Sequence, residues 1–249
     1  MSGKLLNTTR FTLSPLGDSA VVVTFGNEIQ YDIHQKIKIL MELLENEPFV
    51  GLVECVPAYT NLTVYYDPLV VFNEQKYRDK EEISPYEVVC SNIKKKLQQM
   101  KTNKKMTHRT ISIPVCYGGE YGPDLEYVAR YNHLTTDEVI RIHSSGEYLV
   151  YMIGFAPGFP FLGGLSEKIA TPRRSSPRTA IPAGAVGIAG MQTGVYPIST
   201  PGGWQLIGQT PQKLFLPNEN PPSLLQAGDI VKFYPISDEE YKEMKEEIR

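Results

Sequence analysis

Glycine and proline are concentrated between Ala156 and Pro235, where they divide the sequence into short apolar runs. Three of these runs are AVGIAG at 185–190, VYPI at 195–198 and WQLIG at 204–208. Turn residues separate them at the spacing of about 8–12 residues that is typical of all-β domains. The stretch therefore predicts a compact β-barrel or sandwich, and not a continuation of alternating helices and strands.

The first hundred residues have a different pattern, in which strands and helices alternate. β-Branched runs predict strands, and apolar side chains that recur at helical spacing predict amphipathic helices. We expect a turn at 14–18, strands at 20–25, 50–56 and 61–66, and helices at 28–44 and 85–100. The lysine-rich stretch 101–105 is interpreted as a linker, and a docking patch for an acidic partner is the alternative.

The barrel-like stretch is preceded by strands at 109–117 and 148–155 and by helices at 125–131 and 136–144. Thr135 and Glu138 have the spacing of a capping box, and Ser237 and Glu240 have it before a charged C-terminal helix. The chain is therefore predicted to have an α+β fold, with a small α/β domain at 1–104 and a β-barrel domain at 105–249.

The charge balance excludes several classes of protein. The 249 residues carry a formal net charge of -3, so the chain lacks the positive field that attracts nucleic acid or anionic lipid. No apolar run approaches the roughly 20 residues that cross a bilayer, and no signal-peptide pattern is visible. The cysteines Cys55, Cys90 and Cys116 are far apart, as in reducing compartments. We expect a cytoplasmic protein with no nucleic-acid or membrane partner.

Complete catalytic signatures are absent from the sequence. It contains no GxxxxGK[ST] loop and no HExxH, GxSxG or CxxC motif. The histidines at 34, 108, 133 and 143 are scattered, whereas a metal site needs three or four converging donors. We therefore expect surface or capping histidines and no metal, and the sequence identifies no catalytic residue.

A loop rich in phenylalanine follows the predicted strand at 148–155. The segment GFAPGFPFLGG at 154–164 places Phe155, Phe159 and Phe161 in backbone that glycine and proline keep irregular and stiff. A rigid aromatic loop at a strand end is a common wall of a ligand pocket. The alternative is a hydrophobic plug that closes one end of the barrel.

Polar candidates follow this loop in sequence. Arg173, Arg174 and Arg178 lie among prolines, and a guanidinium on a stiff loop suits a carboxylate or a phosphate. Arg178 is the strongest of the three candidates, and exposure to solvent is the alternative.

Amide, hydroxyl, phenol and indole side chains then come within a short stretch, at Gln192, Thr193, Tyr196 and Trp204. A small amide or lactam could stack on the rings and hydrogen-bond through its amide edge. A place in the core is the alternative for Trp204.

The segments GFAPGFPFLGGL, PRTAIPAGAVGIAGMQTGVYP and TPGGWQLIGQTP together resemble the family of allophanate hydrolase subunit 1, the B subunit of prokaryotic 5-oxoprolinase and the sporulation-kinase inhibitor. PLGDSAVVVTFG, IPVCYGGEYGPDLEYVA and AGDIVKFYPIS are also similar to the family, so the resemblance covers nearly the whole chain. It implies an α/β N-terminal domain followed by a cyclophilin-like β-barrel domain.

The resemblance also implies an enzyme subunit that is inactive alone. With a homologous cyclophilin-like C subunit and an A subunit of the hydrolase complex, it would hydrolyse the lactam of 5-oxo-L-proline to L-glutamate. ATP would be used by the complex, and the resemblance assigns no ATP site to this chain. Two other functions stay open: allophanate hydrolase subunit 1, and a regulatory inhibitor that docks on a sporulation sensor histidine kinase.

The family signature gives the candidate substrate-binding residues of this chain: Phe155, Pro157, Phe159, Arg178, Gln192, Thr193, Tyr196 and Trp204. As a hypothesis, Phe155, Phe159 and Trp204 wall the site. Arg178 takes the substrate carboxylate, and Gln192 and Thr193 bond the lactam amide.

Overall fold

The computed structural model of the protein describes residues 10–78, 83–100 and 108–247. The chain divides into two compact units, Met1–Met106 and Thr107–Arg249. The first contains an open sheet with helices and the second a closed barrel, so the predicted α+β fold is confirmed. The predicted linker at 101–105 lies outside the described residues.

The sheet of the first unit is antiparallel, with strand order β1-β2-β4-β3. The strands are β1 (Thr12–Pro15), β2 (Ala20–Thr24), β3 (Leu52–Pro57) and β4 (Asn61–Tyr66). Apolar and polar residues alternate along β4, where Leu62 and Val64 are fully buried and Thr63 is not. One face of the sheet is therefore the core of this unit.

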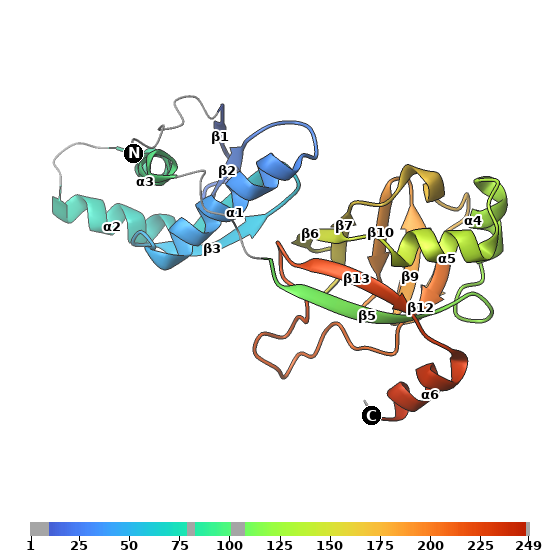
Figure 1. Ribbon diagram of the computed structural model, residues 1–249. Coiled ribbons are helices and arrows are strands. Elements are labelled where there is room, and N and C mark those ends of the chain that lie inside the picture. Colours follow the sequence, from blue (N-terminus) through green and yellow to red (C-terminus); the bar gives the residue numbers. More distant parts are fainter. Residues whose placement is uncertain (1–9, 79–82, 101–107, 248–249) are drawn as a thin grey trace, which may run out of the picture. The chain divides into compact units, whose positions relative to one another are not determined.

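The described part of this unit also contains three helices: α1 (Tyr31–Asn46), α2 (Pro68–Arg78) and α3 (Pro85–Gln99). α1 and α3 pack on the sheet, with α1 lying across it and α3 beside α1 (Figure 1), and α2 packs on α3. The residues Ile37, Leu40 and Leu44 form the buried stripe of α1, as the helical spacing predicts.

Two elements of this unit were not predicted. The first residues of the turn expected at 14–18 belong to the strand β1 instead. β1 is an edge strand that pairs with β2 on one side only, and an edge strand tolerates a proline such as Pro15. The helix α2 begins at Pro68, after Asp67. The Asp67 side chain accepts hydrogen bonds from the backbone of Leu69 at 2.9 Å and Val70 at 3.1 Å, as a residue that caps a helix start does.

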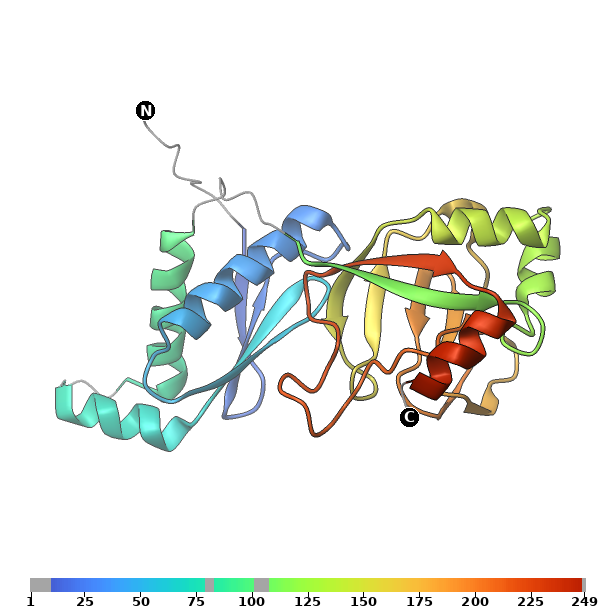
Figure 2. The ribbon, with the colours of Figure 1, turned by 60° about the horizontal axis from the view of Figure 1, so that its bottom comes forward.

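The second unit is a closed seven-stranded barrel with strand order β10-β7-β6-β13-β5-β12-β9. Its strands are β5 (Thr110–Tyr117), β6 (Tyr148–Ile153), β7 (Pro160–Gly163), β9 (Ala185–Ala189), β10 (Gln192–Val195), β12 (Gln205–Gln209) and β13 (Ile230–Pro235). β5 and β13 pair in parallel and lie side by side (Figure 2), although they come from the start and the end of the unit's sequence. A separate ribbon pairs β8 (Arg178–Ile181) with β11 (Thr200–Gly202).

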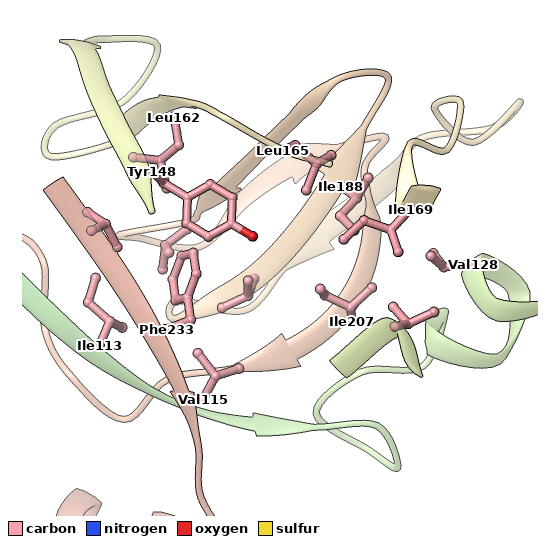
Figure 3. Close-up of a cluster of buried hydrophobic side chains, with 14 of the residues drawn as sticks. Ile113, Val115, Val128, Tyr148, Leu162, Leu165, Ile169, Ile188, Ile207 and Phe233 are labelled. Atoms are coloured by element: carbon pink, nitrogen blue, oxygen red, sulfur yellow. The ribbon is translucent and has the colours of Figure 1, made fainter. Parts of the chain in front are cut away.

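The barrel interior is filled by side chains. Four strands contribute side chains that point into it (Figure 3): Ile113 and Val115 from β5, Tyr148 from β6, Ile188 from β9 and Phe233 from β13, each at most 2% exposed. Since alternate residues of a strand point to opposite faces, these positions form a core and leave no channel.

Helices α4 (Leu125–Tyr131) and α5 (Thr136–Ser144) pack against β12 and β13. The short helix η1 (Glu167–Ile169) and helix α6 (Asp238–Glu247) complete the unit. Both predicted capping boxes are confirmed: Glu138 N–H donates to the Thr135 hydroxyl at 3.2 Å and Glu240 N–H donates to the Ser237 hydroxyl at 3.2 Å. None of the helices described is long and apolar enough to span a membrane.

Candidate functional site

Five aromatic rings gather on the outer face of the barrel, beside β9, β10 and β12, and surround a cavity. The ring of Phe159 lies at their centre, with ring centroids at distances of 5.1–5.8 Å and edge-to-face geometry toward the others. The other four rings belong to Phe155, Phe161, Tyr196 and Trp204. Together with residues of two loops they line a cavity of about 350 Å³, here called the aromatic pocket. A cavity of this size accepts a small ring-shaped ligand.

Four barrel strands, β6, β7, β10 and β12, place these rings. Phe155 and Phe159 lie in the loop between β6 and β7, Tyr196 follows β10 directly, and Trp204 precedes β12. Gly194 in β10 lets the rings approach, because a Cβ at this position would lie 3.1 Å from the Trp204 ring and 3.2 Å from the Phe159 ring. The pocket walls therefore pack on the outer face of β10, opposite the interior-facing side chains of Thr193 and Val195.

Phe155 differs from the other rings because it is both exposed and held in an unfavourable backbone conformation. Its side chain is 68% exposed, and its φ is +66°. A non-glycine residue in this region costs on the order of 1–3 kcal/mol, and such residues gather at functional sites. The rim of the pocket thus presents an apolar ring to whatever binds there.

The segment 172–178, here called the arginine loop, forms another side of the pocket through Arg173, Arg174 and Pro177. The backbone N–H of Arg174 donates to the Gly203 carbonyl at 2.7 Å, and the Gln205 side chain donates to the Pro172 carbonyl at 3.0 Å. These bonds hold the backbone of the loop against the start of β12.

Asp124 joins the arginine loop to the barrel. One oxygen of its carboxylate, Oδ1, accepts from Arg174 at 3.0 Å and from Arg178 at 2.8 Å. The other oxygen, Oδ2, accepts from the backbone N–H of Leu206 at 2.7 Å. The Asp124 side chain is only 7% exposed, so this shared ion pair is poorly solvated.

The phenol of Tyr196 is protonated at neutral pH. Burial raises its pKa to about 12, and the positive charges of Arg173 and Arg178 oppose that rise. A neutral phenol at the pocket wall is able to donate one hydrogen bond to a ligand oxygen.

The structure brings four of the eight predicted site residues into the pocket lining: Phe155, Phe159, Tyr196 and Trp204. Pro157 is exposed in the same loop, and Gln192 is half-buried at the start of β10. Arg178 does not line the pocket, and its side chain is 23% exposed beside Asp124.

Thr193 faces the barrel interior and not the pocket. Its hydroxyl is buried, donates to the Gly187 carbonyl at 3.1 Å and lies 2.9 Å from His143 Nε2. Because the Thr193 hydroxyl hydrogen is used in that bond, its oxygen accepts a hydrogen bond from Nε2–H of His143. The other ring nitrogen, Nδ1, then carries no proton, and it accepts from the Tyr117 hydroxyl at 2.8 Å. His143 is thus a fully buried neutral ring, and burial lowers its pKa to about 3.

The sequence reasoning missed Asp124 and misplaced His34 and His143. His34 is buried in α1, at 1% exposed, and is neither a surface nor a capping residue. The expectation that His143 caps a helix or faces solvent is wrong, because the ring lies inside the barrel and stacks on Phe233 with centroids 4.7 Å apart. Asp124 stands directly before α4 and makes no side-chain capping bond there. No pattern local to Asp124 indicates that its carboxylate turns toward arginines 50 residues away.

A second hollow lies in the first unit between α2 and α3, with a volume of about 520 Å³. Its walls mix apolar and polar side chains, and the carboxylate of Glu87 in its lining is held by the Ser84 capping box. In the described ranges no group of three or more His, Cys, Asp or Glu side chains is arranged to hold a metal ion. The aromatic pocket is therefore the site where rings and charges converge.

The chain matches the family model described as carboxyltransferase domain, subdomain C and D, over residues 11–225. It is 55% identical to the B subunit of 5-oxoprolinase of Bacillus subtilis (strain 168) over 240 residues, which are 96% of this chain and 99% of that protein. It is 44% identical to the 5-oxoprolinase B subunit of Haemophilus influenzae, over 88% of this chain and 95% of that protein.

A more distant relative is urea amidolyase of Saccharomyces cerevisiae, which is 27% identical over 93% of this chain and only 14% of its own length. Among solved structures, the conserved uncharacterized protein PH0987 from Pyrococcus horikoshii is 45% identical, covers 92% of this chain and 100% of its own, and gives a TM-score of 0.53. The protein TTHA0988 is 32% identical with a TM-score of 0.73, and the match covers 88% of this chain and 40% of that chain.

Proposed function

The chain belongs to the carboxyltransferase family of subdomains C and D, and we propose that it is the B subunit of a 5-oxoprolinase. The proposal depends on the similarity to subunits of that name, at 55% and 44% identity over nearly the full length of each. The reaction is hydrolysis of the lactam of 5-oxo-L-proline. Water adds to the carbonyl carbon, the ring C–N bond breaks, and the nitrogen takes up a proton to give L-glutamate.

The subunit works within a complex and is inactive alone. The aromatic pocket is lined by Phe, Arg, Pro, Tyr, Gly and Trp, so its lining contains no pairing of a nucleophile with a base. The sequence also lacks the phosphate-binding loop GxxxxGK[ST]. We assign the missing groups to the homologous C subunit and to the A subunit, and we assign the ATP that drives lactam opening to the complex and not to a site on this chain.

The role of this subunit is to hold the substrate. A five-membered lactam fits a cavity of about 350 Å³ whose walls are the rings of Phe159, Tyr196 and Trp204. Aromatic faces and edges bind such a ring through dispersion and exclude water from it. Phe155 at the rim completes the wall once the partner closes over the pocket. Thr193 takes no part, since its hydroxyl is bonded inside the barrel.

Reconstitution tests the function. Glutamate release from 5-oxo-L-proline and ATP is measured for this chain alone, for the two partner subunits without it, and for all three together. The proposal predicts release only from the full set. It is contradicted if the full set releases no glutamate, or if the two partners alone are as fast as the full set.

The same preparations distinguish the alternatives. Allophanate replaces 5-oxo-L-proline in a parallel assay, because a urea amidolyase is a distant relative at 27% identity. Release of ammonia from allophanate, without glutamate from 5-oxo-L-proline, would favour allophanate hydrolase subunit 1. Capture of a sensor histidine kinase by this chain, with no hydrolase partner bound, would favour the regulatory alternative.

A further inference from the structure

The charges around the aromatic pocket do not balance. Three guanidinium groups, those of Arg173, Arg174 and Arg178, lie at or beside it, and Asp124 is the one carboxylate that pairs with any of them in the described structure. Both oxygens of Asp124 are already used, since Oδ1 accepts from two arginines and Oδ2 accepts from Leu206 N–H. The pocket mouth therefore has an excess of positive charge that an anion complements.

The arginines differ in their access to the cavity. Arg173 and Arg174 line it, and the Arg174 side chain is 37% exposed. Arg178 does not line it and is less exposed, at 23%, with its Nη1 also 3.5 Å from the Trp204 carbonyl oxygen. Arg178 thus faces the protein, whereas Arg173 and Arg174 face the ligand space.

We propose that Arg173 and Arg174 bind the carboxylate of a small ring-shaped acid in the aromatic pocket, and that Asp124 and Arg178 are positioning residues that hold Arg174 over it. For the substrate this rests on the proposed function, and it transfers the role predicted for Arg178 to its two neighbours. Asp124 shares one oxygen between Arg174 and Arg178, so a shift of either guanidinium moves the other. Its second oxygen ties this cluster to β12 beside the indole of Trp204.

Kinetics of the reconstituted complex test the assignment. Arg174→Gln removes a charge-assisted hydrogen bond to the substrate carboxylate, and this loss of binding free energy should raise KM for 5-oxo-L-proline about 10- to 150-fold. Asp124→Asn should raise KM about 5- to 30-fold with a much smaller change in kcat, because it removes the charge that aims Arg174. Asp124→Glu should restore most of the affinity. Arg141→Gln, at an exposed arginine of α5, is the matched control and should leave KM unchanged.

Binding to the chain by itself gives a second readout. Trp204 is the only tryptophan and lies in the pocket wall, so its fluorescence reports on occupancy. The probes are 5-oxo-L-proline and 2-pyrrolidinone, which has the same lactam ring without the carboxylate. The unsubstituted chain should bind the acid at least about 10-fold more tightly than the neutral ring, and Arg174→Gln should abolish that preference.

The outcomes separate the two proposals. If the complex is active, but Arg174→Gln and Asp124→Asn keep the KM of the unsubstituted chain, the arginine assignment is overturned and the 5-oxoprolinase function stands. If the complex is inactive, the function fails, and the fluorescence titration decides on the anion site. The anion site is then overturned if the chain binds 5-oxo-L-proline and 2-pyrrolidinone equally well. It is supported if the chain prefers 5-oxo-L-proline and Arg174→Gln removes that preference.

Discussion

The buried His143 predicts how the stability of the barrel depends on pH. Its ring lies inside the barrel between the Tyr117 and Thr193 hydroxyls and stacks on Phe233. Burial lowers its pKa to about 3, whereas the histidine pKa in an unfolded chain is about 6.5. Between these two values the unfolded chain binds a proton that the folded barrel does not. Stability is therefore complete above pH 6.5 and falls as the pH decreases toward 3.

The magnitude follows from proton linkage. A difference of one bound proton changes the free energy of unfolding by about 1.4 kcal/mol per pH unit, so acidification from pH 7 to pH 5 should cost the barrel about 2 kcal/mol through His143. Burial raises the pKa values of Tyr117 and Tyr148, so these neighbours stay neutral throughout. Two carboxylates also stay ionised in this window because their pKa values are lowered. Glu138 accepts a hydrogen bond from the Thr135 backbone, and Asp238 pairs with Lys242.

Urea denaturation at pH 7, 6 and 5 measures the effect. Fluorescence of Trp204 follows the unfolding of the barrel specifically, because this residue is the only tryptophan of the chain. His143→Gln keeps hydrogen-bonding groups in the same place but does not titrate. The unsubstituted chain should lose about 2 kcal/mol more than His143→Gln between pH 7 and pH 5. Parallel pH dependences for the two proteins would show that the ring is not buried in its neutral form.

Three further substitutions test the pocket and the stability of the barrel. Gly194→Ala places a methyl group 3.2 Å from the Phe159 ring and should cost the barrel about 1–3 kcal/mol, measured by urea denaturation; an unchanged midpoint would show that the rings are loosely packed. Arg109→Ala leaves the carboxylate of Asp229, 7% exposed, without its guanidinium and should cost about 1–3 kcal/mol in the same assay; no loss would show that solvent replaces the arginine. Phe155→Gly relieves the positive φ, so it should leave Tm unchanged or higher while KM for 5-oxo-L-proline rises in the complex. A clear fall in Tm for Phe155→Gly would show that its ring has a structural role.

Local patterns predicted those elements whose stabilising contacts are local. The capping boxes at Thr135 and Ser237 fixed the starts of α5 and α6, since both partners of each box lie three residues apart. The pair Asp67-Pro68 at the start of α2 is an equally local signal of a helix start, which the sequence analysis did not use. The strand β1 was missed because its pairing with β2 decides its conformation, and a proline inside it disfavours a strand in isolation.

The site was predictable only in part, for the same reason. The rings of Phe155, Phe159, Tyr196 and Trp204 lie close to the ends of barrel strands, and the rhythm of the sequence predicts this placement. Which face Thr193 presents depends on the register of β10 with β9, where Thr193 pairs with Ile188. That register is set by the closed barrel and not by neighbouring residues.

A crystal structure of the assembled complex with 5-oxo-L-proline, grown without ATP, would show whether the aromatic pocket of this chain holds the substrate of the hydrolase. We expect the lactam ring to lie against Phe159 and Trp204, with its carboxylate about 3 Å from the Arg174 guanidinium. A lactam bound elsewhere in the complex, with a partner side chain filling the aromatic pocket, would mean that this chain does not hold the substrate.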